Sequence, residues 1–130
     1  MKVLQPPGWP RPRGYANGIS ERGRVVVTAG VVGWDEQEQF TADTLPGQFA
    51  QALRNILTIL AEGEAGPEHI VRLTCYVTDM DAYRASLAEI GEAWKQIMGK
   101  HYPAMALVAV TALVEPQALV EIEATAVVPE

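Results

Sequence analysis

The sequence of 130 residues has one cysteine and no long apolar run, and each shortage excludes a class of protein. The single cysteine, Cys75, excludes an intramolecular disulfide and any metal site built from several cysteines. Its position within an expected strand favours a small buried side chain over a reactive thiol. No segment approaches the ~20 apolar residues of a membrane-spanning helix. The N-terminal residues also lack the apolar core of a signal peptide, so we expect a cytoplasmic protein without a membrane partner.

Basic charge is also scarce. Ten Lys and Arg stand against 16 Asp and Glu, which gives a formal net charge of −6. Such a balance opposes a general attraction to phosphate backbones, so no nucleic-acid partner is expected. The only basic cluster lies close to Glu21, and we interpret it as a solvated surface; its members are Arg11, Arg13, Arg22 and Arg24.

The composition that remains is typical of one globular domain spanning residues 1–130. Hydrophobic residues make up 48% of the chain and charged residues 20%. Residues 1–13 contain four prolines and cannot form a helix. We expect an extended Pro-rich arm there, either lying on the domain or partly disordered.

Two short strands are predicted after the arm, over residues 15–20 and 24–29. Glu21-Arg22-Gly23 would join them in a turn for which glycine is suited. The second strand ends at Gly30, where the missing side chain would let a neighbour or a ligand approach the backbone closely. Trp34 follows, and either a binding role or packing at the domain edge fits it.

Two amphipathic helices and a strand follow. Thr44 or Asp43 would cap a helix over residues 45–62, and Asp79 or Asp81 would cap another that runs to about Gly99. A strand is predicted between them over residues 69–78. The first helix has one apolar face, made of Phe49, Ala52, Leu53, Ile56, Leu57 and Leu60. The stripe expected to be buried on the second is made of Tyr83, Leu87, Ile90, Trp94, Ile97 and Met98.

The C-terminal residues contain two β-type runs, 105–114 and 118–128, around the short connector 115–117. The simplest arrangement for such runs is an antiparallel hairpin. In the second run apolar residues alternate with polar ones, which places Glu121 and Glu123 on the same face. A carboxylate in a strand must face water, a cation, a hydrogen-bond donor or a cavity.

The predicted order is therefore β-β-(β)-α-β-α-β-β. This order indicates an α+β two-layer sandwich, with a mixed β-sheet and two helices on one face. Several strands carry apolar residues on both faces, and the helices can cover only one of them. The remaining patch predicts self-association into a homo-oligomer.

With these elements in place, the chain from Gly14 onward resembles the RidA/YjgF family, also called the L-PSP endoribonuclease family. The residues that carry the resemblance are Gly14-Tyr15, VVVTAGVVG, QFAQALRNILTIL, HIVRLTCYVTDM, Tyr102-Pro103-Ala104 and VEIEATAV. The resemblance implies a chorismate-mutase-like fold and a homotrimer with a small-molecule ligand in clefts between subunits. It also implies hydrolysis of enamines and imines to ketones and ammonia, without a metal or an organic cofactor.

The resemblance further implies that Tyr15, Gly30 and Glu121 belong to the cleft. Glu121 would orient or deprotonate the attacking water, and the Tyr15 hydroxyl and Gly30 backbone would hydrogen-bond substrate or water. Other interpretations stay open. Tyr15 fits a packed aromatic side chain, and Glu121 fits a solvated carboxylate.

The sequence departs from the family at the substrate-binding half of this site, which indicates a divergent subgroup. Met105 stands where imine-deaminating members have an arginine for the substrate carboxylate, and Leu107 stands where cysteine is frequent. Ala29 and Ala88 replace an expected serine and asparagine. Methionine offers no donors for a carboxylate, so a more neutral or apolar ligand is expected. Another cation could substitute, with His101 the nearest candidate and Arg72 or Lys100 weaker ones.

Three functions are compatible with this sequence, in decreasing order of support. The first is a cofactor-free RidA-type hydrolase or deaminase of a small enamine or imine, not anchored through an amino-acid carboxylate. The alternative is a non-enzymatic small-molecule-binding or regulatory trimer whose cleft is lined by Met105, Leu107 and Trp34. Ribonuclease activity comes third, because the chain is acidic.

Overall fold

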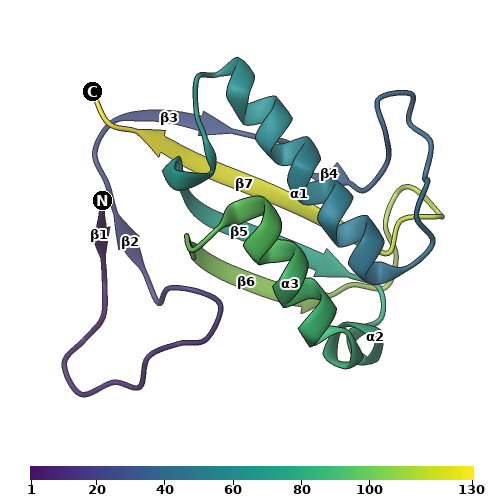
Figure 1. The fold of residues 1–130 in the computed structure, drawn as a ribbon, viewed down its shortest axis with the longest axis horizontal. Helices are drawn as coiled ribbons and strands as arrows, with labels where there is room; N and C mark the ends of the chain where they lie inside the picture. The colour runs from purple at the N-terminus through teal and green to yellow at the C-terminus, as the bar shows by residue number, and fades with distance from the viewer.

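A mixed five-stranded sheet is the framework of the computed structural model, which describes residues 1–130 (Figure 1). Four strands lie in the order β3 (Arg24–Val27), β7 (Val120–Val128), β5 (Ile70–Val77) and β6 (Ala104–Ala109). The short β4 (Val31–Val32) also pairs with β7. Strand β7 runs antiparallel to β3, β4 and β5, whereas β5 and β6 are parallel.

The helices lie on one face of this sheet, as Figure 1 shows for α1 (Leu45–Glu62) and α3 (Leu87–Met98). A short α2 (Met80–Ala85) precedes α3, and a 3₁₀ turn, η1 (Pro67–His69), precedes β5. The Thr44 hydroxyl accepts a hydrogen bond from the Gly47 amide and caps α1, as predicted. The predicted α+β two-layer architecture is confirmed.

The core fills the space between the helices and the sheet. The predicted apolar face of α1 is buried there except at Leu57, which is half-buried. The alternation predicted for β7 is also confirmed, because its apolar positions face the helices; they are Val120, Ile122, Ala124 and Ala126. Gln48 is the one buried polar side chain, and its amide contacts Ala42, Gln117 and Leu119 through hydrogen bonds.

The predicted C-terminal hairpin is wrong. Strand β5 lies between β6 and β7, so the two runs do not pair with each other. The first run leaves the sheet after Ala109, and residues 110–119 cross the end of β5 to reach β7. The connection from β5 to β6 runs through α2 and α3, and a strand–helix–strand crossover of this kind joins parallel neighbours.

The predicted N-terminal hairpin is wrong as well. Tyr15 lies outside any strand, and β2 (Ile19–Ser20) pairs with β1 (Lys2–Val3) of the arm rather than with β3. The chain passes from one sheet to the other at Gly23, which has a positive φ of 155°. A Cβ atom at Gly23 would lie 2.1 Å from the Val128 carbonyl oxygen, so glycine is required there.

The second predicted helix is divided at Ser86 into α2 and α3. Asp79 caps α2 through its side chain, as predicted. Ile90, Trp94 and Met98 are buried, but Leu87 is 54% exposed and the prediction of a buried side chain is wrong there. Leu87 instead borders a cavity beside α3.

The face of the sheet away from the helices carries a mixed set of side chains. Strand register places Val25 and Val27 at one edge, both 62% exposed, and Val108 on the other edge strand, 45% exposed. The polar positions between them include Glu121 and Glu123. The apolar residues predicted for this face are thus present at both edges, and Val127 of β7, paired with Val25, adds to them.

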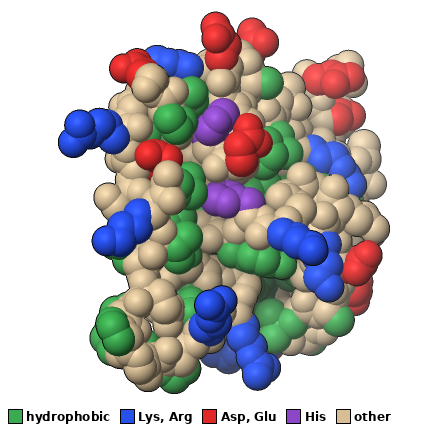
Figure 2. Space-filling view, turned by 60° about the vertical axis from the view of Figure 1, so that its left-hand side comes forward, with side chains coloured by type: hydrophobic (Ala, Val, Ile, Leu, Met, Phe, Trp, Pro, Cys, Tyr) green, Lys and Arg blue, Asp and Glu red, His purple; other side chains and the backbone are tan.

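On the side of the molecule shown in Figure 2, basic side chains are scattered among acidic and hydrophobic ones. No continuous basic surface forms there. None of the helices combines the length and the apolar character that crossing a membrane would require.

Candidate functional site

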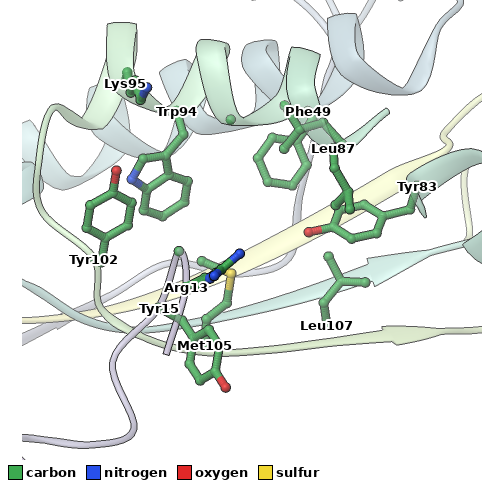
Figure 3. A pocket seen from close by; sticks show the side chains of 13 residues that line it. Arg13, Tyr15, Phe49, Tyr83, Leu87, Trp94, Lys95, Tyr102, Met105 and Leu107 are labelled. Atoms are coloured by element: carbon green, nitrogen blue, oxygen red, sulfur yellow. The ribbon is translucent and has the colours of Figure 1, made fainter. Parts of the chain in front are cut away.

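A cavity of about 540 Å³ opens between α3 and the edge strand β6 (Figure 3). That volume lies within the range of ~300–1,000 Å³ usual for small-molecule sites. Most of its wall is hydrophobic; the lining residues are Arg13, Gly14, Tyr15, Phe49, Tyr83, Leu87, Ile90, Gly91, Trp94, Lys95, Tyr102, Met105 and Leu107.

Three of the predicted site residues meet at this cavity. The parallel register sets Met105 beside Leu73 and Leu107 beside Cys75, so both side chains point to the helix-covered face. Tyr15 reaches the cavity because the next residue, Ala16, is held at the sheet. Ala16 forms a parallel bridge with Ala104, and its amide donates to the Pro103 carbonyl at 2.9 Å.

Aromatic side chains form one end of the cavity. The rings of Trp94 and Tyr102 are stacked, with centroids 5.9 Å apart and planes 8° from parallel. The indole nitrogen of Trp94 donates to the His101 carbonyl at 3.1 Å, which fixes the ring. Such a surface suits a flat, apolar ligand group.

The hydroxyl of Tyr83 points into the same space (Figure 3) and makes no hydrogen bond within the protein. Burial raises the pKa of Tyr83, so the phenol stays protonated at neutral pH and remains a hydrogen-bond donor. The sequence pattern predicted Tyr83 only as a core residue. Its spacing on the helix gave no sign that the hydroxyl would reach a cavity.

Gly91 forms part of the cavity wall in the middle of α3. Glycine within a helix is destabilising by ~1 kcal/mol relative to alanine. A Cβ atom at Gly91 would have no heavy atom within 4 Å, so packing does not require glycine here. The missing side chain leaves the cavity wide at this point.

Glu121 and Gly30 lie together, but on the opposite face of the sheet from Met105. A Cβ atom at Gly30 would lie 2.4 Å from Glu121 Oε2, which explains a glycine at this position. The sequence predicted a close approach at Gly30, and the neighbour is Glu121 itself. In a single chain the sheet separates this carboxylate from the cavity.

The Glu121 carboxylate has no ion-pair or hydrogen-bond partner in the protein. Glu123, two residues along the same face, accepts a hydrogen bond from the Tyr76 hydroxyl at 2.8 Å. This bond, followed by partial desolvation, raises the pKa of Tyr76. Glu123 therefore has a partner within its own chain, whereas Glu121 is free to contact water or a ligand.

Trp34 and His101 lie away from the cavity. Trp34 packs against Phe40 at 5.7 Å between ring centroids and borders a shallow depression with Arg54 and Asn55. His101 donates from Nε2 to the Ile70 carbonyl at 2.7 Å. It lines a neighbouring groove that shares Tyr15 and Tyr102 with the cavity. The structure thus does not bring either predicted binding residue beside Met105.

The cations that border the cavity are Arg13 and Lys95, which the sequence did not single out. Of the predicted substitutes for the missing arginine, Arg72 lies on the open sheet face and Lys100 in the neighbouring groove. The position of Arg13 next to Gly14-Tyr15 was the available signal. It lay inside a cluster that we interpreted as solvated surface.

Cys75 is fully buried in the core, and burial raises the pKa of its thiol to about 12. The prediction of a small buried side chain is confirmed. No three His, Cys, Asp or Glu side chains are placed so that they could hold a metal ion together.

The fold and the cavity define an α+β domain with a small-molecule-sized site at the edge of its sheet. The model of the family described as Endoribonuclease L-PSP matches residues 10–128, and the chain belongs to that family. The RutC family protein slr0709 of Synechocystis is 30% identical over 131 residues, covering 99% of this chain and 98% of that protein.

Two solved structures show the same fold. YyfB of Yersinia pestis, a Rid family protein of unknown function, has a TM-score of 0.86 and 30% identity, covering 98% of both chains. TdcF of E. coli, solved with bound serine, has a TM-score of 0.69 and 28% identity, covering 98% of this chain and 99% of its own. Family membership supports a small-molecule deaminase or binding role.

Proposed function

We propose that this protein is a cofactor-free hydrolase of a small enamine or imine whose apolar body occupies the cavity beside β6. The observation that carries the proposal is the meeting of Tyr15, Met105 and Leu107 at one apolar cavity of about 540 Å³. The bound serine in TdcF supports a ligand of amino-acid size in this family. Met105 in place of an arginine sets the present site apart.

The active unit in this proposal is a homotrimer, in which Glu121 of a second copy faces the cavity of the first. Two observations support it. Glu121 is unpartnered and lies behind the sheet, and the same face carries Val25 and Val27 with most of their surface exposed. Packing this face against another copy would remove apolar surface from water. It would also bring a free carboxylate to a site that has none.

The proposed reaction adds water across the C=N bond. A water oxygen bonds to the imine carbon while the water proton passes to Glu121 and then to the substrate nitrogen. In the resulting carbinolamine, Glu121 takes the hydroxyl proton and passes it to the amine nitrogen, the C–O bond becomes a carbonyl as the C–N bond breaks, and a ketone and ammonia leave. The hydroxyls of Tyr15 and Tyr83 would donate hydrogen bonds to the substrate.

Hydrolysis of imines generated by an amino-acid oxidase, followed by ammonia release, tests this proposal. We expect Glu121→Gln to lower the rate by about 100-fold or more, because the amide cannot accept the proton. Glu123→Gln is the matched control, since that carboxylate is bonded to Tyr76. Equal rates for wild type and Glu121→Gln would remove Glu121 from the mechanism, and no release by the wild type would remove the activity.

A second candidate function, a non-enzymatic binding or regulatory trimer, is favoured by Met105 and Leu107. These side chains offer an apolar surface but no reactive group. Thermal unfolding with a panel of small amino- and oxo-acids distinguishes the two, because a ligand that binds only the folded state raises its stability. A rise in melting temperature without ammonia release from any imine would establish the binding function instead.

A further inference from the structure

Two cationic side chains border the apolar cavity, and no acidic side chain does. Arg13 comes from the N-terminal segment and Lys95 from α3. This local excess of positive charge occurs in a chain with a net charge of −6. The cavity is therefore one of the few places on this protein that would attract an anion.

The donors of Arg13 are free. Its guanidinium makes no ion pair and no hydrogen bond to a protein acceptor, and the same holds for the Lys95 ammonium. By contrast, Arg24 donates to the Gly63 carbonyl at 2.8 Å, and Arg84 lies 3.9 Å from Asp81. In Figure 3 the Arg13 side chain extends toward the middle of the cavity, beside Met105.

The backbone around Arg13 is held in place despite its position in the arm. Gly14 has a φ of +80°, a left-handed conformation that turns the chain between Arg13 and Tyr15. Ala16 is buried and anchored at Ala104 and Pro103. Arg13 is thus three residues from a fixed point, and its guanidinium can serve the cavity without ordering a long free segment.

From this arrangement we propose that Arg13, assisted by Lys95, forms an anion subsite, so that the ligand of the cavity is a carboxylate with an apolar or aromatic body. The inference rests on the proposed function only in taking the cavity as the ligand site. A carboxylate ligand takes the place of the neutral ligand that Met105 suggested. The cation for the carboxylate is Arg13, which comes from the N-terminal segment instead of β6.

The two ends of the cavity differ in character, which supports a ligand with an apolar end and an anionic end. Figure 3 places Leu87 and Leu107 together at one end, beside the Tyr83 hydroxyl, where an apolar group would pack against the two leucines. Arg13 lies near the stacked Trp94 and Tyr102, where a planar group and its carboxylate would fit. A guanidinium can give a carboxylate two parallel hydrogen bonds, which fixes orientation as well as affinity.

Binding of a matched pair of probes tests the subsite. The probes are 3-phenylpropanoate and its neutral amide, 3-phenylpropanamide, measured by calorimetry with wild type, Arg13→Gln and Lys95→Gln. We expect the wild type to prefer the acid, and Arg13→Gln to weaken the acid by about tenfold or more while leaving the amide unchanged. Lys95→Gln should have a smaller effect, and the preference should shrink as salt is added.

Arg22→Gln provides the control, because it removes the same charge from an exposed turn outside the cavity. Acid binding that is equal in wild type and Arg13→Gln, or equal losses in Arg13→Gln and Arg22→Gln, would overturn the subsite. Failure of the wild type to bind either probe would overturn it too. Melting temperatures of all variants show that each is folded.

Turnover separates this inference from the proposed function. The imine of phenylalanine carries a carboxylate, and the imine of phenethylamine does not. Arg13-dependent acid binding without ammonia release from either imine would leave the subsite standing and end the hydrolase proposal. Equal hydrolysis of both imines, unchanged in Arg13→Gln, would support the hydrolase and overturn the subsite.

Discussion

Glu121 and Glu123 show how two identical side chains on one face of β7 acquire different roles. Glu123 is bonded to Tyr76, whereas Glu121 lies against the bare backbone of Gly30 and contacts no protein donor. A larger residue at position 30 would occupy the space of the Glu121 carboxylate. Gly30 therefore positions the proposed base, Glu121, by leaving room for its carboxylate.

Gly30→Ala should displace Glu121 and lower imine hydrolysis by about tenfold or more, because a proton acceptor must lie within hydrogen-bond reach of its water. The clash is with the end of a flexible side chain, so the free energy of unfolding should change by less than ~1 kcal/mol. A comparison of hydrolysis rate with urea unfolding checks both expectations.

Gly33→Ala is the contrasting variant, since its Cβ atom would lie 2.3 Å from the buried Gln48 backbone carbonyl oxygen. It should destabilise the fold severely. Full activity in Gly30→Ala would show that Gly30 does not position Glu121.

Among the elements, β6 decides where the cavity lies. The sequence pattern predicted that β6 is a strand, but it did not predict which strand pairs with it. Alternation of apolar and polar residues indicates which residues share a face, and this succeeded for β7. The alternation pattern contains no information on parallel or antiparallel pairing, so a hairpin between residues 105–114 and 118–128 was the simplest interpretation. The helical segment between β5 and β6 was the better signal, because a strand–helix–strand connection favours parallel neighbours.

Helix α3 offers a test of whether the cavity is left open at the expense of stability. Gly91→Ala should raise the free energy of unfolding by ~0.5–1 kcal/mol, because alanine favours the helix and its methyl group meets open space. Chemical denaturation measures the change.

Gly99→Ala should have the opposite sign, since Gly99 ends α3 with a φ of +69° that alanine resists. A loss of stability in Gly91→Ala would mean that the glycine is required by the fold, and the argument for an open cavity at this position would fall.

At the scale of the whole molecule, the candidate site has two parts on opposite faces of one sheet. The sequence and its family resemblance pointed to Tyr15, Met105 and Leu107 on one side and to Glu121 and Gly30 on the other. They did not predict Arg13, Tyr83 or Lys95, because nothing in local spacing shows that the arm, α2 and α3 meet at one cavity. Those positions follow from tertiary packing, and so does the separation of Glu121 from Met105.

Mixed trimers test most directly whether Glu121 of one copy serves the cavity of another. Glu121→Gln removes the carboxylate. Gly91→Trp blocks the cavity with a large side chain, which the open space at position 91 can accept. Each variant alone should be inactive in imine hydrolysis. Co-expressed in equal amounts, they should regain roughly a quarter of the wild-type rate, because random assembly of a symmetric trimer pairs an open cavity with an intact Glu121 at that frequency. No recovery, in mixtures shown to be hetero-oligomers by mass spectrometry, would contradict a site shared between copies.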